Sequence, residues 1–191
     1  LEMLASIAID SMPTMSVESV ALPGVRNQDS GPTVAQVAEA LSYDLASIVG
    51  GASDVPRIFL AAMPQGLSDI RETAKRKALF FKSVLPLILK VNEGLRVDRA
   101  RLLAIQEIVH GGGKPSAVER LWLAMMSDRY SVSRDNIPAL LRRVDIIPPS
   151  MAIAQAAAES GWGESRFARE GNALFGQWTF ATGNLVPEER D

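Results

Sequence analysis

A glutamate ends the most apolar helical run in the chain. Residues 151–158 are apolar except for Gln155, and Glu159 follows them directly, ahead of a glycine-rich stretch that contains Trp162. A run this apolar predicts a helix that is buried on most sides, and the glycines that follow predict its end. A carboxyl group held against apolar surface and an indole is poorly hydrated when ionised, so it can keep its proton near neutrality. Such a group is suited to general-acid catalysis.

The residues alone leave a second explanation of Glu159 open. The side chain can simply end its helix in solvent, or it can form an ion pair with Arg166 or Arg169 a few residues later. Carboxylates are mostly exposed in folded proteins, so this explanation needs no special environment. Deciding between the two requires a longer pattern than one acid and its neighbours.

The longer pattern is the run AQAAAESGWGESRFAREGNALFGQW, at residues 154–178. It resembles the signature of glycoside hydrolase family 73, the bacterial N-acetylglucosaminidases of the Bax-type and flagellar rod-associated kinds. The matching pieces are the alanine helix ending at 159–163, the following short helix with Ser165 and Ala168, and the segment 172–176. Residues from about 55 to 144 also resemble the helical part that precedes this signature in Bax-type proteins.

The resemblance implies a mainly α fold of lysozyme-like type, in which a helical lobe and the start of a small β lobe flank a saccharide groove. It implies that Glu159 is the catalytic general acid, and that Asn172, Phe175 and Gly176 shape the floor under the sugar. Two tryptophans, Trp162 and Trp178, are candidates for stacking on sugar faces. Each could equally be a core side chain, because aromatic residues dominate cores as well as binding sites.

Glycoside hydrolysis usually needs a second group on the opposite face of the sugar, either a carboxylate or the substrate's own acetamido group. The candidates downstream of the signature are Glu188, Glu189 and Asp191. Their charged, proline-led surroundings are also typical of a solvated loop, so no second catalyst is assigned. The resemblance further implies a domain truncated at its C-terminal side, which leaves open whether the chain alone is active.

Three functions follow from these patterns, and a purely cytoplasmic helical interaction protein stays open as a further alternative. The first is hydrolysis of β-1,4 bonds at N-acetylglucosamine in peptidoglycan, with a buried glutamate as general acid. The second is lytic transglycosylase chemistry, in which one glutamate acts as acid and then base and the product is a 1,6-anhydro sugar. The third is a non-catalytic module that binds glycan or helps to assemble the envelope. The expected partner is a peptidoglycan glycan strand, and the resemblance implies a location in the periplasm or cell envelope.

Composition excludes several other classes of function. The 191 residues contain no cysteine and one histidine, His110, so thiolate chemistry and histidine-cluster metal sites are excluded. No cofactor or metal is expected. A formal net charge of −2 gives no positive field for a phosphate backbone, so nucleic acid is not an expected partner. No apolar stretch is long enough for a transmembrane helix. The first residues carry an acid and no basic flank, so they are not an intact secretory signal.

Hydrophobic periodicity predicts the helices that must position Glu159. We expect one amphipathic helix over residues 33–49, and another from 68 to about 92 that is kinked at Pro86. A third helix is expected to begin at an N-cap Asp98 and to end at the glycine triplet 111–113. Ser116 and Glu119 form a capping box for a helix that should bury Leu121, Trp122 and Met125. Shorter helices are expected over 135–144 and from Pro149 onward.

These elements divide the chain into three predicted parts. Residues 1–54 are an irregular lead-in plus one amphipathic helix, residues 55–145 are the helical region of Bax-type proteins, and residues 146–191 are the N-terminal part of a glucosaminidase catalytic domain.

Overall fold

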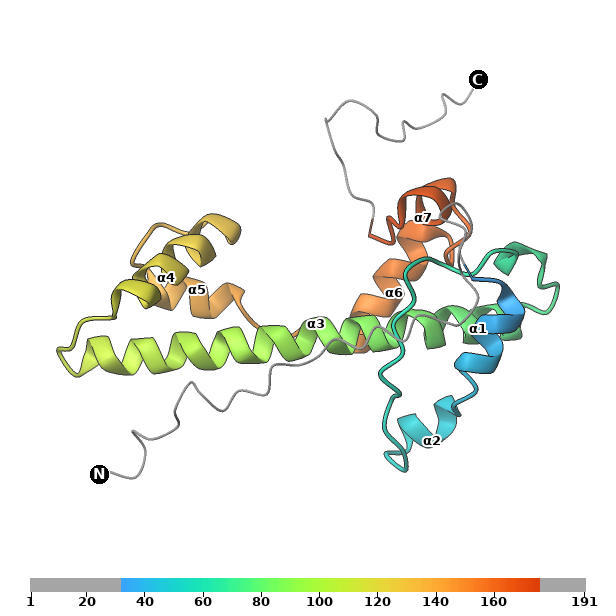
Figure 1. The fold of residues 1–191 in the computed structure, drawn as a ribbon, viewed down its shortest axis with the longest axis horizontal. Coiled ribbons are helices and arrows are strands. Elements are labelled where there is room, and N and C mark those ends of the chain that lie inside the picture. The colour runs from blue at the N-terminus through green and yellow to red at the C-terminus, as the bar shows by residue number, and fades with distance from the viewer. Residues whose placement is uncertain (1–31, 176–191) are drawn as a thin grey trace, which may run out of the picture.

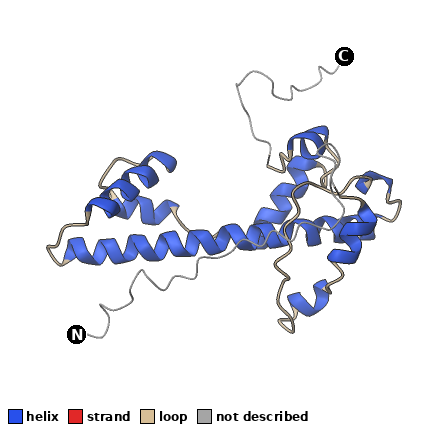
Figure 2. Ribbon diagram, viewed as in Figure 1, coloured by secondary structure: helices blue, strands red, loops and turns tan. Residues whose placement is uncertain are grey.

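The computed structural model describes residues 32–175, and this part of the chain is mainly helical, as predicted (Figures 1 and 2). The predicted β lobe would begin at about residue 176 and so lies outside the described residues. The elements are α1 (Val34–Ala40), α2 (Leu45–Val49), the 3-10 helix η2 (Leu67–Asp69), α3 (Thr73–His110), α4 (Ala117–Arg129), α5 (Ile137–Arg143), α6 (Pro149–Ser160) and α7 (Arg166–Gly171). Within residues 32–175, no helix combines the length and the apolar character that a membrane span requires.

Helix α3 is the axis of the structure. Its 38 residues give it a length of about 57 Å. Helices α4 and α5 lie along its C-terminal half, and α1 and α6 lie against its N-terminal half (Figure 1). The prediction of two helices separated before Asp98 is wrong, because the helix continues through both Pro86 and Gly94 to His110. A single glycine in a helix interior costs only about 1 kcal/mol, which packing along both halves outweighs.

A tyrosine compensates for the proline inside α3. Pro86 has no N–H, so the carbonyl of Lys82, four residues earlier, has no helical donor. The hydroxyl of Tyr43 donates a hydrogen bond to that carbonyl over 2.9 Å. Partial burial raises the pKa of Tyr43 to about 12. This contact explains how an internal proline is accommodated by a residue from a distant segment.

The same contact accompanies a break in the predicted helix over residues 33–49. The structure has two short helices there, α1 and α2, separated by Leu41 to Asp44. Asp44 caps α2 by accepting hydrogen bonds from the backbone N–H groups of Ala46 and Ser47. An aspartate at this position favours starting a new helix over continuing the old one, and the break leaves Tyr43 directed at α3.

Two hydrophobic cores lie against opposite halves of α3. The first core combines α1, the segment 55–70, the N-terminal half of α3 and α6. Its buried members are Val37, Leu41, Met63, Leu67, Leu79, Phe80, Val84, Ile88, Ala152, Ile153, Ala156 and Ala157. The first core thus draws residues from all three predicted parts of the chain. The three-part division itself stays a prediction.

The second core joins the C-terminal half of α3 to α4 and α5. Its buried members are Leu102, Ile105, Leu123, Met126, Ile137, Leu140 and Val144. The capping box of Ser116 and Glu119 is confirmed. The predicted buried face of α4 is wrong for Leu121 and Met125, which are 66% and 62% exposed, while Leu123 and Met126 face the core. Trp122, the third residue predicted to be buried, is partly buried against this core.

Candidate active site

Helix α6 carries Glu159 and packs against α3. Its buried side chains are mostly alanines, whose small size lets the two helices approach closely. Its entry is held by Asn92 of α3, a buried side chain that donates to the carbonyl of Ile147 over 2.8 Å and accepts from the N–H of the same residue over 3.0 Å. The start of α6 is therefore fixed to α3 by a pair of hydrogen bonds. The rest of the helix is held by its packing in the first core.

Glu159 lies on the last turn of α6 and is exposed. The prediction that this carboxyl is buried is wrong for the described part of the chain. The helix is buried on one face only, and Met151, Gln155 and Glu159 share the opposite, exposed side. Ala154 and Ala158 are also exposed, so the apolar run does not mean burial all round. Among residues 32–175 no ion pair to Glu159 is seen, so neither predicted partner, Arg166 or Arg169, pairs with it there. Arg166 lies 4.0 Å from Glu170 instead.

A tight turn follows Glu159 and reverses the chain. Gly161, Trp162 and Gly163 all have positive φ, at 57°, 62° and 80°. This is an uncommon conformation for three successive residues, and two glycines reduce its cost. The buried hydroxyl of Ser160 closes the turn by accepting from the N–H of Gly163 over 2.9 Å. The N–H of Ser165 donates to the carbonyl of Ser160 over 3.0 Å.

Trp162 points from this turn into the first core. Its ring meets Phe80 and Phe81 edge-on, with centroid separations of 5.7 and 5.9 Å. The ammonium of Lys77 lies 4.4 Å from the indole centroid. These contacts are those of a half-buried packing residue. The predicted use of Trp162 as a sugar platform stays a prediction.

The turn lies directly against the segment 55–70. A β-carbon added to Gly163 would lie 2.8 Å from Met63, 3.2 Å from Phe80 and 3.3 Å from Leu67. Asn172, which ends α7 at a φ of 50°, donates its side-chain amide to the carbonyl of Ala61 over 3.0 Å. The segment 55–70 therefore supports the chain on both sides of α7.

A second glutamate of the motif has a different environment from the first. Glu164 is part-buried and forms an ion pair with Arg76 of α3, with 2.7 Å between Oε1 and Nε. Both atoms are shielded from solvent, and their alignment is not that of a hydrogen bond. Sequence reasoning missed this pair because Arg76 lies on a distant helix, and only the fold brings it beside the turn.

Comparisons with known proteins find two matches. Residues 135–189 match the glucosaminidase family, described as mannosyl-glycoprotein endo-beta-N-acetylglucosaminidase. The chain is also 39% identical over 125 residues to the protein bax of Escherichia coli strain K12. After the family match, we call residues 135–189 the glucosaminidase segment. The bax match covers 61% of this chain and 44% of that protein, so the chain spans less than half the length of its relative. No solved structure gives a significant match.

The glucosaminidase segment holds every predicted site residue except the candidate second carboxylate Asp191, and the structure describes four of them. Glu159, Trp162, Asn172 and Phe175 are described, and Phe175 is 44% exposed. The remaining predicted residues, Gly176, Trp178, Glu188, Glu189 and Asp191, lie outside the described residues. The exposed Glu159 and the core-facing Trp162 do not form the predicted pairing of carboxyl and indole.

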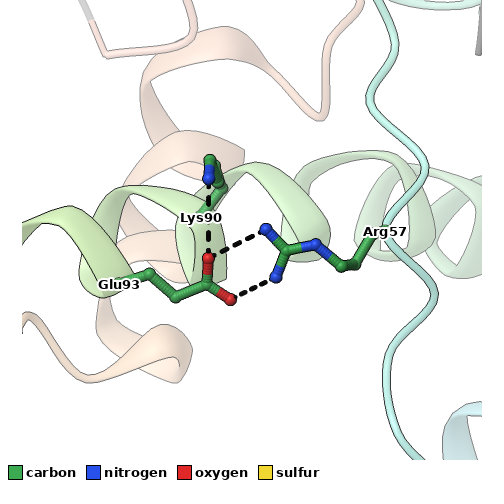
Figure 3. Close-up of polar contacts among 3 residues, drawn as sticks. All are labelled: Arg57, Lys90 and Glu93. Atoms are coloured by element: carbon green, nitrogen blue, oxygen red, sulfur yellow. Dashed lines mark hydrogen bonds and ion pairs between the residues drawn. The ribbon is translucent and has the colours of Figure 1, made fainter. Parts of the chain in front are cut away.

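A small pocket lies on another side of α3, away from the glucosaminidase segment. Its lining residues are Val55, Pro56, Arg57, Phe59, Pro86, Leu89, Lys90 and Glu93. Arg57 donates two hydrogen bonds to Glu93, over 2.6 and 3.0 Å, and Lys90 lies 3.7 Å from the same carboxylate (Figure 3). The hydrogen bond from Arg57 lowers the pKa of Glu93. The cluster joins the segment 55–70 to α3 and includes no predicted site residue.

Proposed function

We propose that this protein hydrolyses β-1,4 glycosidic bonds at N-acetylglucosamine in peptidoglycan, with Glu159 as the general acid. The observation that carries the proposal is the match of residues 135–189 to a glucosaminidase family, with Glu159 at the end of α6 inside it. The exposed position of the carboxyl supports the proposal in one respect. A general acid must come within hydrogen-bond distance of the leaving oxygen, and an exposed side chain is accessible to a large polymer.

Because Glu159 is exposed among the described residues, a group outside residues 32–175 has to displace the water around its carboxyl. A sugar bound against the carboxyl would do this, because it would replace hydration with ring carbons and hydroxyl groups. We propose that Phe175, the exposed aromatic of the described segment, contacts that sugar, together with Gly176 and Trp178. Trp162 would contribute by supporting the turn, since its ring already packs on Phe80 and Phe81.

The proposal also includes a second participant and a location. The opposite face of the sugar is served either by its own acetamido group or by one of the downstream carboxylates, Glu188, Glu189 or Asp191. The substrate would be glycan strands of peptidoglycan, and the protein would act in the periplasm or cell envelope.

The test is Glu159→Gln, which keeps the shape of the side chain and removes the acid. Purified peptidoglycan is incubated with parent and variant, and new reducing ends are counted. We expect the variant to lose about 100-fold or more of the rate, because general-acid catalysis contributes about 10²–10⁴-fold. The matched control is Glu170→Gln, an exposed glutamate on α7 of the same segment, which should retain parental activity.

The products separate the competing functions. Hydrolysis adds one water to each cleaved strand, whereas a transglycosylase gives a 1,6-anhydro product without that gain, and mass spectrometry resolves the two. Equal turnover by the parent and by Glu159→Gln would exclude Glu159 as the acid. Binding of peptidoglycan without turnover by the parent would support the non-catalytic glycan-binding module.

A further inference from the structure

The ion pair between Arg76 and Glu164 links α3 to the turn that follows Glu159. Glu164 is the residue after Gly163, so the pair holds the far end of the turn. The near end is held by Ser160, whose hydroxyl and carbonyl accept from Gly163 and Ser165. Arg76 also donates to the carbonyl of Ile70 over 3.5 Å, which brings the segment 55–70 into the same contact.

The burial of this pair distinguishes it from the other ion pairs of the described chain. Its two side chains are 24% and 32% exposed, whereas those of Arg57 and Glu93 are 53% and 40% exposed. A shielded pair is screened less by water and salt than an exposed one. Removing one partner leaves the other charge poorly solvated, so the geometry of this pair is strongly enforced.

The turn needs such enforcement because it is strained. Three successive residues with positive φ persist only where surrounding contacts hold them, and Trp162, which is not a glycine, is one of the three. Without the contact at Glu164, the turn can relax toward ordinary backbone conformations. Glu159 lies on the helical turn directly before this loop, so a shift of the loop frays the end of α6 and moves the carboxyl.

We propose that Arg76 is a positioning residue for the reaction: acting through Glu164, it holds the turn 160–165 and thereby fixes Glu159 against the glycosidic oxygen. This inference rests on the proposed function of Glu159. Arg76 itself contacts no substrate in this account. Glu164 is accordingly an anchor for the backbone, and the two glutamates of the motif have separate tasks.

The test compares Arg76→Met with Arg57→Met. Both variants replace an arginine that forms an ion pair with a glutamate, and both pairs involve α3, but only Arg76 holds the turn. We expect Arg76→Met to lower kcat by about 10- to 100-fold with KM changed by less than about threefold, because displacement of a reacting group by about 1 Å costs that much. Arg57→Met should keep the parental kcat.

A second readout does not depend on activity. Hydrogen exchange at the amides of Gly163 and Ser165 reports the two bonds that close the turn. Exchange should be at least tenfold faster in Arg76→Met and unchanged in Arg57→Met. The reversed pair, Arg76→Glu combined with Glu164→Arg, should recover part of both kcat and protection. Glu164→Gln, a milder change, serves in place of Arg76→Met if the latter does not fold.

The outcomes separate this inference from the proposed function. Faster exchange with an unchanged kcat would overturn the positioning role, because the turn would then move without affecting the acid. Unchanged exchange would also overturn it, whatever the activity. If the parent and Glu159→Gln turn over peptidoglycan equally, the proposed function fails at the acid, and with it the positioning role, while the exchange data still decide whether Arg76 holds the turn.

Discussion

The two cores on α3 are assembled from the chain in different ways. The second core joins consecutive elements, the end of α3 followed by α4 and α5. The first core gathers α1, the segment 55–70, the start of α3 and α6, which are far apart in sequence. Its connections are individual side chains that bridge these segments, namely Tyr43, Arg76, Asn92 and Asn172. Residues 159–175, which lie within the glucosaminidase match, pack on the first core, so the candidate site is positioned by long-range contacts.

The largest effect that separates the two cores should come from truncating their most buried members. Phe80 is 0% exposed and packs on Trp162, and Leu140 of the second core is 1% exposed. Phe80→Ala should cost about 3–5 kcal/mol and Leu140→Ala about 2–5 kcal/mol in the free energy of unfolding. Only Phe80→Ala should change the environment of Trp162 in the folded state.

Fluorescence during denaturant unfolding checks this prediction. The measurement uses a background in which Trp122 and Trp178 are phenylalanine, so that Trp162 is the sole reporter. The folded-state emission of Leu140→Ala should match that of its background. A shift as large as that in Phe80→Ala would mean that the second core also shapes the turn, and the comparison between cores would fail.

The next largest effect should come from Gly163. Gly163→Ala places a β-carbon at a φ of 80°, which costs about 1–2 kcal/mol, and crowds Met63 at 2.8 Å, which costs about 1–3 kcal/mol more. Gly112 is a matched control, since its φ is 76° and a β-carbon there meets nothing within 4 Å. Gly112→Ala should therefore show the strain alone, about 1–2 kcal/mol.

Thermal unfolding of the two glycine variants measures the difference. The difference between the two losses of stability gives the energetic cost of crowding the segment 55–70 against the turn 160–165. Equal destabilisation by the two substitutions would indicate that Met63 moves aside at no cost, and that the turn is less tightly supported than its contacts imply.

A smaller effect should follow from the hydroxyl that compensates for Pro86. Tyr43→Phe leaves the Lys82 carbonyl without its donor, at a cost of about 1–2 kcal/mol. It should also change the response to alkali. Because the pKa of Tyr43 is raised from 10.0 to about 12 in the folded protein, its contribution is complete below pH 10 and is lost as the pH rises toward 12.

Denaturant unfolding at a series of alkaline pH values checks this. The difference in stability between the parent and Tyr43→Phe should shrink between about pH 10 and pH 12. A constant difference over that range would show that the hydroxyl is not the titrating group.

Sequence patterns predict the second core better than the first, and the reason is the range of the contacts. The capping box at Ser116 and the glycines that end α3 act within a few residues, so they are readable directly. The continuity of α3 depends on Tyr43, and the shape of the signature turn depends on Arg76. Neither partner can be inferred from local spacing. Even in the second core the burial of Leu121 was predicted wrongly, because α4 has apolar residues on both faces.

The same distinction applies to the candidate site. The glucosaminidase resemblance and the glycine end of α6 follow from the motif, and the family match and Gly161 confirm them. The burial of Glu159 was predicted from an apolar composition that alanines supply on exposed and buried faces alike. Alanine is small enough to be tolerated in solvent, so a run of alanines indicates burial less reliably than a run of larger side chains.

The smallest effect concerns the two capping boxes, one for each core. Glu119 accepts from the backbone N–H of Ser116 over 2.6 Å, and Gln36 accepts from that of Thr33 over 2.9 Å. The backbone hydrogen bond from Ser116 lowers the pKa of Glu119 from its usual 4.5. The contribution of the ionised Glu119 to stability is therefore present above pH 4.5 and is lost as the pH falls through the lowered pKa. The capping box of Gln36 carries no titratable group.

Glu119→Gln should cost about 0.3–1 kcal/mol near neutral pH, because it removes a charge from a helix N-terminus, and this cost should vanish in acid. Gln36→Met should cost a similar free energy of unfolding at every pH, because the acceptor that it removes is uncharged in acid and near neutrality alike. Unfolding of both variants from about pH 6 down to about pH 3 measures the contrast. The cost of Glu119→Gln could instead persist below the lowered pKa of Glu119. The glutamine amide would then fail to accept the hydrogen bond because of its geometry, and the two capping boxes would differ in geometry and not in charge.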